Sequence, residues 1–220
     1  MLFASRRDAG ERLGKYLHWR GVTADLVLGL PRGGVVVAAS VARELKLPLD
    51  VLVVRKLGHP MQPEFAVGAI AEPDAVFLNE DSLREYPLSS TQLGKIIAQE
   101  KIRLQYYRRQ FHLHESPALE GKAVLLVDDG LATGATAEAA AISARKQKAS
   151  RIIVSSPVAS TNAVERLRRV ADAVEVLSED PDFQAVGQFY QEFPPTEDEE
   201  VVSLLREAVM ESKSQIAVGR

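Results

Sequence analysis

The stretch VLLVDDGLATGATA, residues 124–137, decides the fold of this chain. The apolar run at 123–127 predicts a buried strand, and two carboxylates, Asp128 and Asp129, follow it directly. The alanine-rich segment 134–148 has strong helix propensity and predicts a helix that starts just after Thr133. Ligands bind at the carboxyl ends of strands in open α/β sheets, so we expect the acid pair and the helix start at a binding edge.

The alternation of strand and helix extends from this stretch in both directions. Short runs that are rich in branched apolar residues predict further buried strands at 26–30, 50–54, 151–154 and 173–177. Helical spacing or helix propensity predicts helices at 35–46, 134–148 and 161–170. The expected fold class is α/β, a parallel sheet flanked by helices and joined by right-handed crossovers.

Two segments interrupt this alternation. Residues 68–79 (GAIAEPDAVFLN) predict a hairpin that turns at Pro73-Asp74, and a polar helix is expected at 91–112. The acidic segment 178–200 is the second interruption, and a closing helix is expected at 199–212. The sequence therefore predicts one domain over residues 1–220, with a core at about 22–177 and two excursions that frame one cleft.

The composition is ordinary for a globular protein, because 46% of the residues are hydrophobic and 26% are charged. The chain has no cysteine, which excludes disulfides, thiolate metal sites and a cysteine nucleophile. Its net charge of −3 gives no electrostatic reason to expect a nucleic-acid partner. No apolar run approaches the roughly 20 residues that cross a bilayer, and the opening is too polar for a secretory signal. A cytoplasmic protein without membrane partners is expected.

The segment that opens the alanine-rich helix has the character of an anion site. Backbone N–H groups at a helix start point outward, and the small residues Thr133, Gly134, Ala135 and Thr136 allow an anion to approach them. Neither GxxxxGK[ST] nor GxGxxG occurs in the sequence. A ribose 5-phosphate would use both features, with its phosphate at the helix and its hydroxyls at the carboxylates. The alternative is that the aspartates only end a strand and cap a turn.

The stretch resembles the phosphoribosyl-pyrophosphate (PRPP) signature of type I phosphoribosyltransferases, which is an apolar strand, two acidic residues and A-T-G-x-T. The resemblance implies a type I phosphoribosyltransferase-like fold with a long lid at about 58–114 and a small C-terminal hood at about 178–200. It implies that Asp128 and Asp129 hold the ribose. It assigns the 5′-phosphate to Ala132, Thr133, Gly134, Ala135 and Thr136.

The resemblance also implies an enzyme of nucleotide metabolism, a glycosyltransferase in which a nitrogenous base displaces pyrophosphate from C1 of PRPP. Negative charge grows on the leaving group, so Mg²⁺ is expected as the cofactor, bridging pyrophosphate and ribose hydroxyls. The acid pair would reach this metal through the ribose hydroxyls or water and would stabilise the positively charged sugar. Asp129 is the candidate for taking a proton from the base.

A second loop, GLPRGG at 29–34, follows the first predicted strand. Its simplest interpretation is a tight turn in which glycine and proline shape the backbone. In the resembling family this position binds pyrophosphate, which implies that task for Arg32, Gly33 and Gly34, and Arg32 is expected to point into the cleft.

Basic residues follow the next predicted strand, in VVRKLGHP. The family commonly has a cation here near pyrophosphate, which implies Lys56 before Arg55, although one of them could simply pair with a carboxylate such as Glu64. A mobile lid is expected to exclude water from the reaction. Its arginines are candidates for reaching pyrophosphate from this subunit or a neighbouring one, which leaves a homodimer open: Arg103, Arg108 and Arg109.

The segment DPDFQAVGQFYQEF, 180–193, resembles the hood of hypoxanthine-guanine phosphoribosyltransferases, where an aromatic residue stacks on the purine. Here Phe183 stands one residue early and Gln184 takes the expected place. The lysine that reads the purine oxygen in that family is missing from VSSPVAS after Val154. We expect Phe183 or Tyr190 to stack on a planar base read by Gln184 and main-chain groups, or else these aromatics only pack the hood.

Two other functions remain open. A PRPP- or nucleotide-binding regulatory module could have the same fold without turnover. A phosphohydrolase would use the acid pair for metal, but it would usually need more carboxylates or histidines. His18, His112 and His114 are expected on helix surfaces, and Trp19 is expected to pack at the N-terminal helix.

Overall fold

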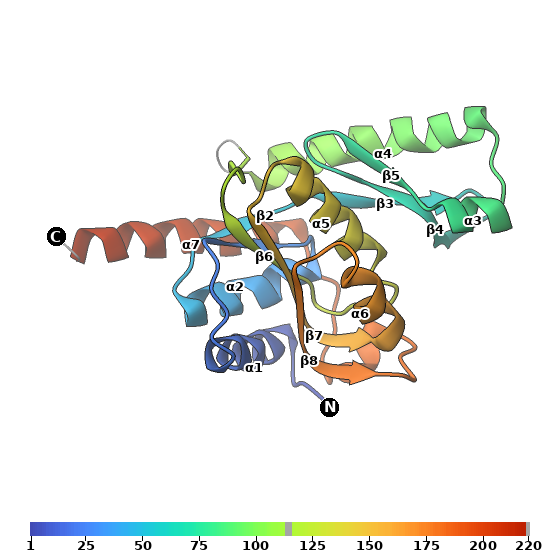
Figure 1. The fold of residues 1–220 in the computed structure, drawn as a ribbon. Coiled ribbons are helices and arrows are strands. Elements are labelled where there is room, and N and C mark those ends of the chain that lie inside the picture. The colour runs from blue at the N-terminus through green and yellow to red at the C-terminus, as the bar shows by residue number, and fades with distance from the viewer. Residues whose placement is uncertain (113–115, 219–220) are drawn as a thin grey trace.

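A five-stranded parallel sheet forms the centre of the molecule, in the order β2-β1-β6-β7-β8 (Figure 1). The computed structural model describes residues 1–112 and 116–218, with the backbone alone at 63–64 and 212–218. The strands of this sheet are β1 (Leu26–Gly29), β2 (Leu49–Val51), β6 (Ala123–Val127), β7 (Arg151–Ser160) and β8 (Ala173–Asp180). The predicted α/β class with a parallel sheet is confirmed.

Helices cover both faces of this sheet. On one face lie α1 (Arg6–Trp19), α2 (Gly33–Leu45) and α7 (Asp198–Val218), and on the other lie α5 (Ala135–Lys146) and α6 (Thr161–Leu167). Consecutive residues of β1 point to opposite faces, so Val27 packs with the first group and Leu26 with the second. The strands are therefore apolar on both faces, as the sequence predicts.

The strand predicted at 50–54 is present as β2, but its predicted end is wrong, because the chain leaves the central sheet after Val51. Leu52 and Val53 lie between two strands and are buried, and the buried carboxylate of Glu72 accepts the N–H of Val53 at 2.8 Å. A new strand then begins at Val54 and belongs to a second sheet. The change of sheet could not be read from the sequence, because residues 51–54 are continuously apolar. Hydrophobic periodicity does not distinguish one buried strand from two.

Residues 54–111 form a projecting subdomain, which we call the arm (Figure 1). It contains the antiparallel sheet β3-β4-β5 and two helices, and its elements are β3 (Val54–His59), β4 (Gln62–Ala71), β5 (Ala75–Leu78), α3 (Glu80–Glu85) and α4 (Ser90–Phe111). The hairpin predicted at 68–79 is confirmed, because β4 and β5 pair from Ala71 and Ala75 outward across the predicted turn. The segment predicted as a lid at about 58–114 lies mostly within the arm, its end at 113–114 lies outside the described residues, and its role as a lid stays a prediction.

Buried charges attach the arm to the central sheet. His112 follows α4, and its side chain is 5% exposed between Glu72 and Asp50, with Nε2 2.8 Å from a Glu72 oxygen. Arg108 Nε lies 3.0 Å from the same carboxylate. The prediction that His112 lies on a helix surface is therefore wrong, because the end of α4 turns inward against β2. His114 lies outside the described residues.

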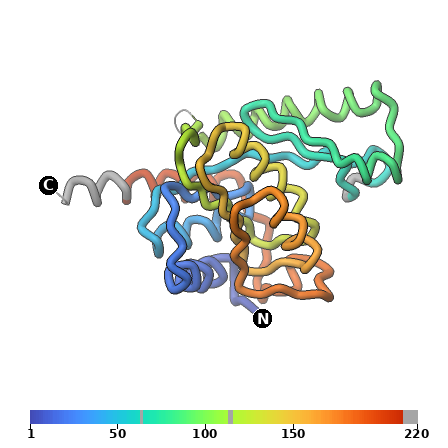
Figure 2. Tube along the Cα trace, viewed as in Figure 1, coloured from blue at the N-terminus to red at the C-terminus, as the bar shows by residue number. Residues whose placement is uncertain are grey.

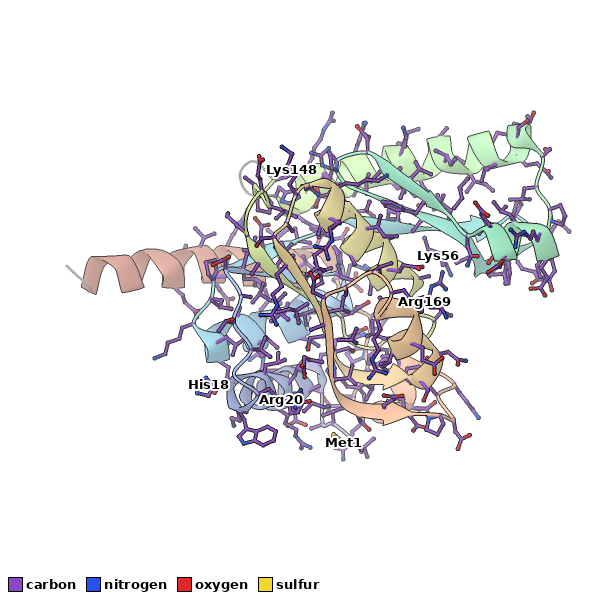
Figure 3. All side chains as sticks on the ribbon, viewed as in Figure 1. Met1, His18, Arg20, Lys56, Lys148 and Arg169 are labelled. Atoms are coloured by element: carbon purple, nitrogen blue, oxygen red, sulfur yellow. The ribbon has the colours of Figure 1, made fainter. Side chains whose placement is uncertain are left out.

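The N-terminal segment pairs with the segment after β8. Phe3 forms a parallel bridge with Tyr190, next to the 3₁₀ helix η1 (Val186–Phe189), and the N-terminus lies beside this region (Figure 2). At the other end of α1, Trp19 is 78% exposed, so the prediction that it packs is wrong. His18 is exposed as predicted, next to Arg20 in Figure 3. In the described residues, no helix is long and apolar enough to cross a membrane.

Candidate functional site

The carboxyl ends of β1 and β6 lie side by side, and this adjacency builds the site. Gly29 pairs with Val127, and the N–H of Leu30 donates to the Val127 carbonyl at 2.9 Å. The loop after β1 therefore runs next to Asp128 and Asp129, which follow β6. The structure thus brings together two groups of predicted site residues that are far apart in the sequence.

The acid pair packs directly against the backbone of the second loop. A Cβ atom on Gly34 would lie 2.8 Å from Asp128 Oδ1, and one on Gly33 would collide with Asp129 Oδ2. Any side chain at these two positions would therefore displace the carboxylates. The Pro31–Arg32 peptide bond just before them is cis.

Burial and mutual repulsion govern the charges of the acid pair. Burial raises the pKa of Asp128 well above its usual value, and the neighbouring Asp129 charge raises it further. Burial also raises the pKa of Asp129, although a hydrogen bond and the charge of Arg6 oppose the rise. The main-chain N–H of Asp129 donates to Asp128 Oδ1 at 2.9 Å and fixes that side chain. Negative charge on this pair is therefore held at a cost that a cationic ligand would offset.

Arg6 is a site residue that the sequence analysis missed. Its Nε donates to Asp129 Oδ2 at 2.7 Å, and the side chains of the two residues are only 11% and 15% exposed. Arg6 lies at the first position of α1, and 123 positions separate it from Asp129. No local pattern marks such a pair, because an arginine in the first turn of a helix is ordinary.

The hood, residues 178–200, covers the acid pair from the other side. The Tyr190 hydroxyl donates to the main-chain carbonyl of Asp129 at 2.6 Å. Val186 packs so closely on Gly130 that a Cβ atom there would collide with its methyl groups. Burial raises the pKa of the Tyr190 hydroxyl, so this group stays a proton donor. The hood is thus attached to the backbone of the acid pair as well as to the N-terminal segment.

The predicted phosphate loop has the expected geometry at the start of α5. Gly134 caps this helix with φ of 72°, and no side chain caps it in the described part of the chain. The carbonyl of Ala132 accepts the Ser160 hydroxyl at 2.6 Å, which ties the loop to the end of β7. Among the main-chain N–H groups in the first turn of α5, the described residues give a side-chain acceptor only to that of Ala135. This acceptor is Thr133 Oγ1 at 3.4 Å. The first turn of α5, including Thr136, therefore presents N–H donors at the sheet edge, where an anion is favoured.

Arg32 lies at the start of α2 and faces the beginning of α7. Its Nη1 is 3.6 Å from Asp198 Oδ1 and 3.9 Å from Glu197 Oε2, and its side chain is 41% exposed. These are long contacts at a half-exposed position, so they hold the guanidinium weakly. Its assignment to pyrophosphate stays a prediction, and binding there requires it to leave these carboxylates.

Arg55 and Lys56 lie within β3 of the arm. The expectation that they follow a strand of the central sheet is therefore wrong. Arg55 Nε pairs with the buried Glu100 of α4 at 3.0 Å, so Arg55 serves the interior of the arm. The alternative partner Glu64 has a side chain outside the described residues. Figure 3 shows Lys56 on the edge of the arm that faces α6 in this view, and its assignment to pyrophosphate stays a prediction.

The arginines of the predicted lid have other partners. Arg103 pairs with Glu100 at 2.7 Å on the same helix. Arg108 binds Glu72 at the base of the arm and its Nη1 lies 3.4 Å from the Pro73 carbonyl. These contacts hold Arg103 and Arg108 within the arm, which leaves Arg109 as the remaining lid arginine for the predicted role.

The aromatic residues of the hood divide into buried and accessible ones. Tyr190 is 6% exposed and packs 5.6 Å from Phe3, so its ring faces are not open to a base. Phe183 is half-buried and packs 5.0 Å from Phe189. Gln184 is exposed, and its N–H donates to Gln188 Oε1. The packing alternative therefore describes Tyr190, while Phe183 and Gln184 stay candidates for contacting a base.

The described residues contain no cluster of three or more carboxylate or histidine side chains that could hold a metal. Asp128 and Asp129 offer only hard oxygen donors at one edge. Mg²⁺ typically keeps several waters and binds through one or two carboxylates together with substrate phosphates. The donor set thus fits a cation that arrives with a phosphorylated ligand and does not fit a metal bound by protein alone.

Comparison with known proteins gives three results. The family model described as "Phosphoribosyl transferase domain" matches residues 8–193. "Putative phosphoribosyl transferase MT0597" of Mycobacterium tuberculosis (strain CDC 1551 / Oshkosh) is 43% identical over 208 residues, which are 94% of this chain and 47% of that protein. The crystal structure of TT1426 from Thermus thermophilus has a TM-score of 0.78 at 44% identity, and the match covers 94% of this chain and 99% of that one. The chain spans about half the length of the curated relatives that it matches over most of its own length.

Proposed function

This chain belongs to the phosphoribosyl transferase domain family, and from that premise we propose that it transfers a phosphoribosyl group from PRPP to a nitrogenous base, with Mg²⁺ as cofactor. In this reaction the bond between C1 of the ribose and a pyrophosphate oxygen breaks, and a bond between C1 and a base nitrogen forms. The base releases a proton. Pyrophosphate leaves with the electrons of the broken bond.

The observation that carries this proposal is the meeting of three features at one sheet edge. The acid pair lies in contact with the glycine loop after β1 and is followed directly by the open helix start of α5. PRPP has a phosphate at one end, ribose hydroxyls in the middle and pyrophosphate at the other end. The three features match these three parts in the same order.

The start of α5 binds the 5′-phosphate. Its main-chain N–H groups and the Thr133 and Thr136 hydroxyls supply donors, and the helix dipole favours the negative charge. Gly134 adopts φ of 72°, which a side chain would disfavour, and its backbone sets the approach to the helix. Because this part of the ligand does not react, it anchors the sugar in one position for the chemistry at C1.

Asp128 and Asp129 act on the ribose. They accept hydrogen bonds from its hydroxyls and stabilise the positive charge that grows on the ring as pyrophosphate leaves. The protein holds both carboxylates in place before the substrate arrives, against the burial that raises their pKa values. That unfavourable arrangement favours a partner whose charge becomes positive in the transition state. Asp129 is the candidate acceptor for the proton of the base.

Pyrophosphate binds at the loop after β1, where Gly33 and Gly34 have no side chain between the backbone and the acid pair. Lys56 and Arg32 supply cations from the arm and from the start of α2. Mg²⁺, held through water or the ribose hydroxyls at Asp128 and Asp129, would neutralise charge on the leaving group. The arm and the hood flank the site and limit the access of water, which competes with the base for C1.

The base lies under the hood, where Phe183 stacks on it and Gln184 reads its edge. Tyr190 is excluded from stacking because its ring is buried and its hydroxyl holds the Asp129 carbonyl. Since the segment after Val154 lacks a lysine that could bind a purine oxygen, we expect hypoxanthine and guanine to be poor substrates.

The test is a substrate screen read as pyrophosphate release. The protein is mixed with PRPP and Mg²⁺, and purines, pyrimidines and pyridines are supplied one at a time, with Asp129→Asn as the control of lowered activity. Release that depends on one class of base and on Mg²⁺ supports the proposal. Binding of PRPP without release for any base would instead identify a regulatory module. A protein that neither binds nor cleaves PRPP contradicts both functions.

A further inference from the structure

Arg6 lies against the acid pair, the glycine loop after β1 and the hood. Its Nε donates to Asp129 Oδ2, and it lies close enough to Gly33 that a Cβ atom there would be 2.7 Å from the same nitrogen. Its Nη1 donates to the Pro194 carbonyl at 2.7 Å, in the last part of the hood. Its guanidinium carbon lies 3.7 Å from the centre of the Phe193 ring, so the cation stacks on that ring.

These contacts fix the guanidinium from three directions. A planar group that donates at two edges and stacks on one face has few other orientations. The N-terminal backbone adds to this rigidity, because Phe3 and Ala4 exchange main-chain hydrogen bonds with residues 189–192. The side chain is 11% exposed, so it is a built part of the site and not a mobile surface arginine.

Asp129 depends on this arrangement for its orientation. Its neighbour Asp128 is fixed by the main-chain N–H of Asp129, whereas the Asp129 carboxylate is held by Arg6. Burial disfavours the negative charge of Asp129 and Arg6 opposes this effect, so without Arg6 the Asp129 carboxylate would lose the cation that holds its Oδ2. Arg6 binds the carboxylate through its Oδ2 atom.

We propose that Arg6 is a positioning residue, which holds the Asp129 carboxylate in the orientation that accepts the ribose hydroxyls and joins it to the closed hood. This inference rests on the proposed function, because it concerns the sugar that the acid pair binds. Arg6 does not touch the reacting atoms. It acts through Asp129, and its contacts to Phe193 and Pro194 make that orientation conditional on the hood being in place.

The test measures hydroxyl selectivity by calorimetry and needs no turnover. The probes are ribose 5-phosphate and its 2-deoxy and 3-deoxy analogues, each of which lacks one ring hydroxyl. The wild-type protein should bind ribose 5-phosphate roughly tenfold more tightly than at least one analogue, since a hydrogen bond to a charged group is lost. Asp129→Asn defines how much of this selectivity Asp129 carries.

Arg6→Gln should remove the same selectivity as Asp129→Asn, while the analogue that lacks the hydroxyl binds about as it does to wild type. Arg6→Lys keeps the charge and should restore part of the selectivity. Arg7→Gln removes an exposed charge from the same helix turn and should leave both affinities unchanged. A merely structural role of Arg6 would weaken ribose 5-phosphate and the analogues equally.

Three outcomes overturn the inference. The first is full selectivity in Arg6→Gln, and the second is equal weakening of all probes. The third is tighter binding of ribose 5-phosphate to Arg6→Gln, which would show that Arg6 blocks the site. A wild-type protein that binds none of these sugar phosphates contradicts the proposed function itself, so the two failures are distinguishable. Circular dichroism of each variant separates loss of binding from loss of fold.

Discussion

Two adjacent aspartates, Asp128 and Asp129, lie buried at the end of a strand, where their negative charge reduces the stability of the protein. Burial raises the pKa of both Asp128 and Asp129, and the charge of Asp129 raises that of Asp128 further, so each carboxylate is less favourable in the folded chain than in water. The glycine loop after β1 allows this close packing, because any side chain there would collide with the pair. Active sites commonly retain such destabilised groups.

Asp129→Asn should lower turnover by tenfold or more, which corresponds to about 1.4 kcal/mol of barrier. The substitution keeps the volume and removes a charge that stabilises the positive sugar. Pyrophosphate release at saturating PRPP measures the effect, and Asp182→Asn at an exposed position of the hood is the control. Undiminished turnover would exclude the Asp129 charge from the mechanism.

Asp128→Asn should stabilise the protein while it weakens PRPP binding. A carboxyl group with a raised pKa favours folding when protonated, and this contribution is lost as the pH rises through the raised pKa. Asparagine has no charge to repel Asp129, so the gain in the free energy of unfolding should be larger at pH 8 than at pH 5. We expect a rise in Tm of about 2–4 °C for each kcal/mol gained, measured by circular dichroism. A lower Tm at both pH values would contradict this account.

The attachment of the arm shows how single elements depend on buried charge. Burial by itself would lower the pKa of His112, but hydrogen bonds to Asp50 and Glu72 and the charges of both carboxylates raise it to about 9. Arg108 from α4 faces the same Glu72 carboxylate. The imidazolium thus links the end of α4 to β2 and to the turn after β4.

His112→Gln should therefore lower stability in a way that depends on pH. The contacts of the protonated His112 with Asp50 and Glu72 stabilise the fold fully below pH 6.5. This contribution is lost as the pH rises through the raised pKa of about 9. At pH 6 we expect a loss of about 2 kcal/mol in the free energy of unfolding, and the difference from wild type should shrink toward pH 9.5. Urea denaturation at both pH values tests this, with exposed His18→Gln as the control. An equal loss at both values would rule out the imidazolium.

Phe183→Ala tests the hood as a separate element. Removing the ring takes away the stacking surface proposed for the base, but Phe189 and Tyr190 still attach the hood to Phe3. We expect the KM for the base to rise about tenfold, since stacking of a base on an aromatic ring contributes about 1–3 kcal/mol, while the KM for PRPP stays near the wild-type value. If the KM values for the base and PRPP rise together, Phe183 only packs the hood.

The elements of this fold could largely be predicted from the sequence, because their signals are local. The strand at 123–127, the helix after Gly134 and the hairpin at Pro73-Asp74 each follow from propensity and spacing within a few residues. The break between Val51 and Val54 could not be predicted, since it depends on Glu72 satisfying a main-chain N–H. The contacts of Arg6 and His112 could not be predicted for the same reason, because their partners are distant in the chain. Ion pairs between elements leave no periodic trace.

At the scale of the whole molecule, the site joins the N-terminal segment, two loops of the central sheet, the start of α5 and the hood. A ligand that binds all of them stabilises the fold by mass action, by about 2.7 kcal/mol at 100 times its Kd. We expect PRPP with Mg²⁺ to raise the Tm of the wild-type protein more than ribose 5-phosphate does. The difference should vanish when Lys56 and Arg32 are both replaced by glutamine. Equal shifts with both ligands in the wild type would show that pyrophosphate makes no contact.

The exposure of Trp19 determines how such melting experiments can be read. It is the one tryptophan in the sequence, and with 78% of its surface in contact with solvent its indole is already hydrated in the native protein. Unfolding would change the surroundings of this fluorophore little, so its emission maximum would shift only slightly. Intrinsic fluorescence would then report a nearly flat curve for a protein that is unfolding. An optical signal from the site requires a second tryptophan, and Phe193→Trp would place that indole directly against the guanidinium of Arg6.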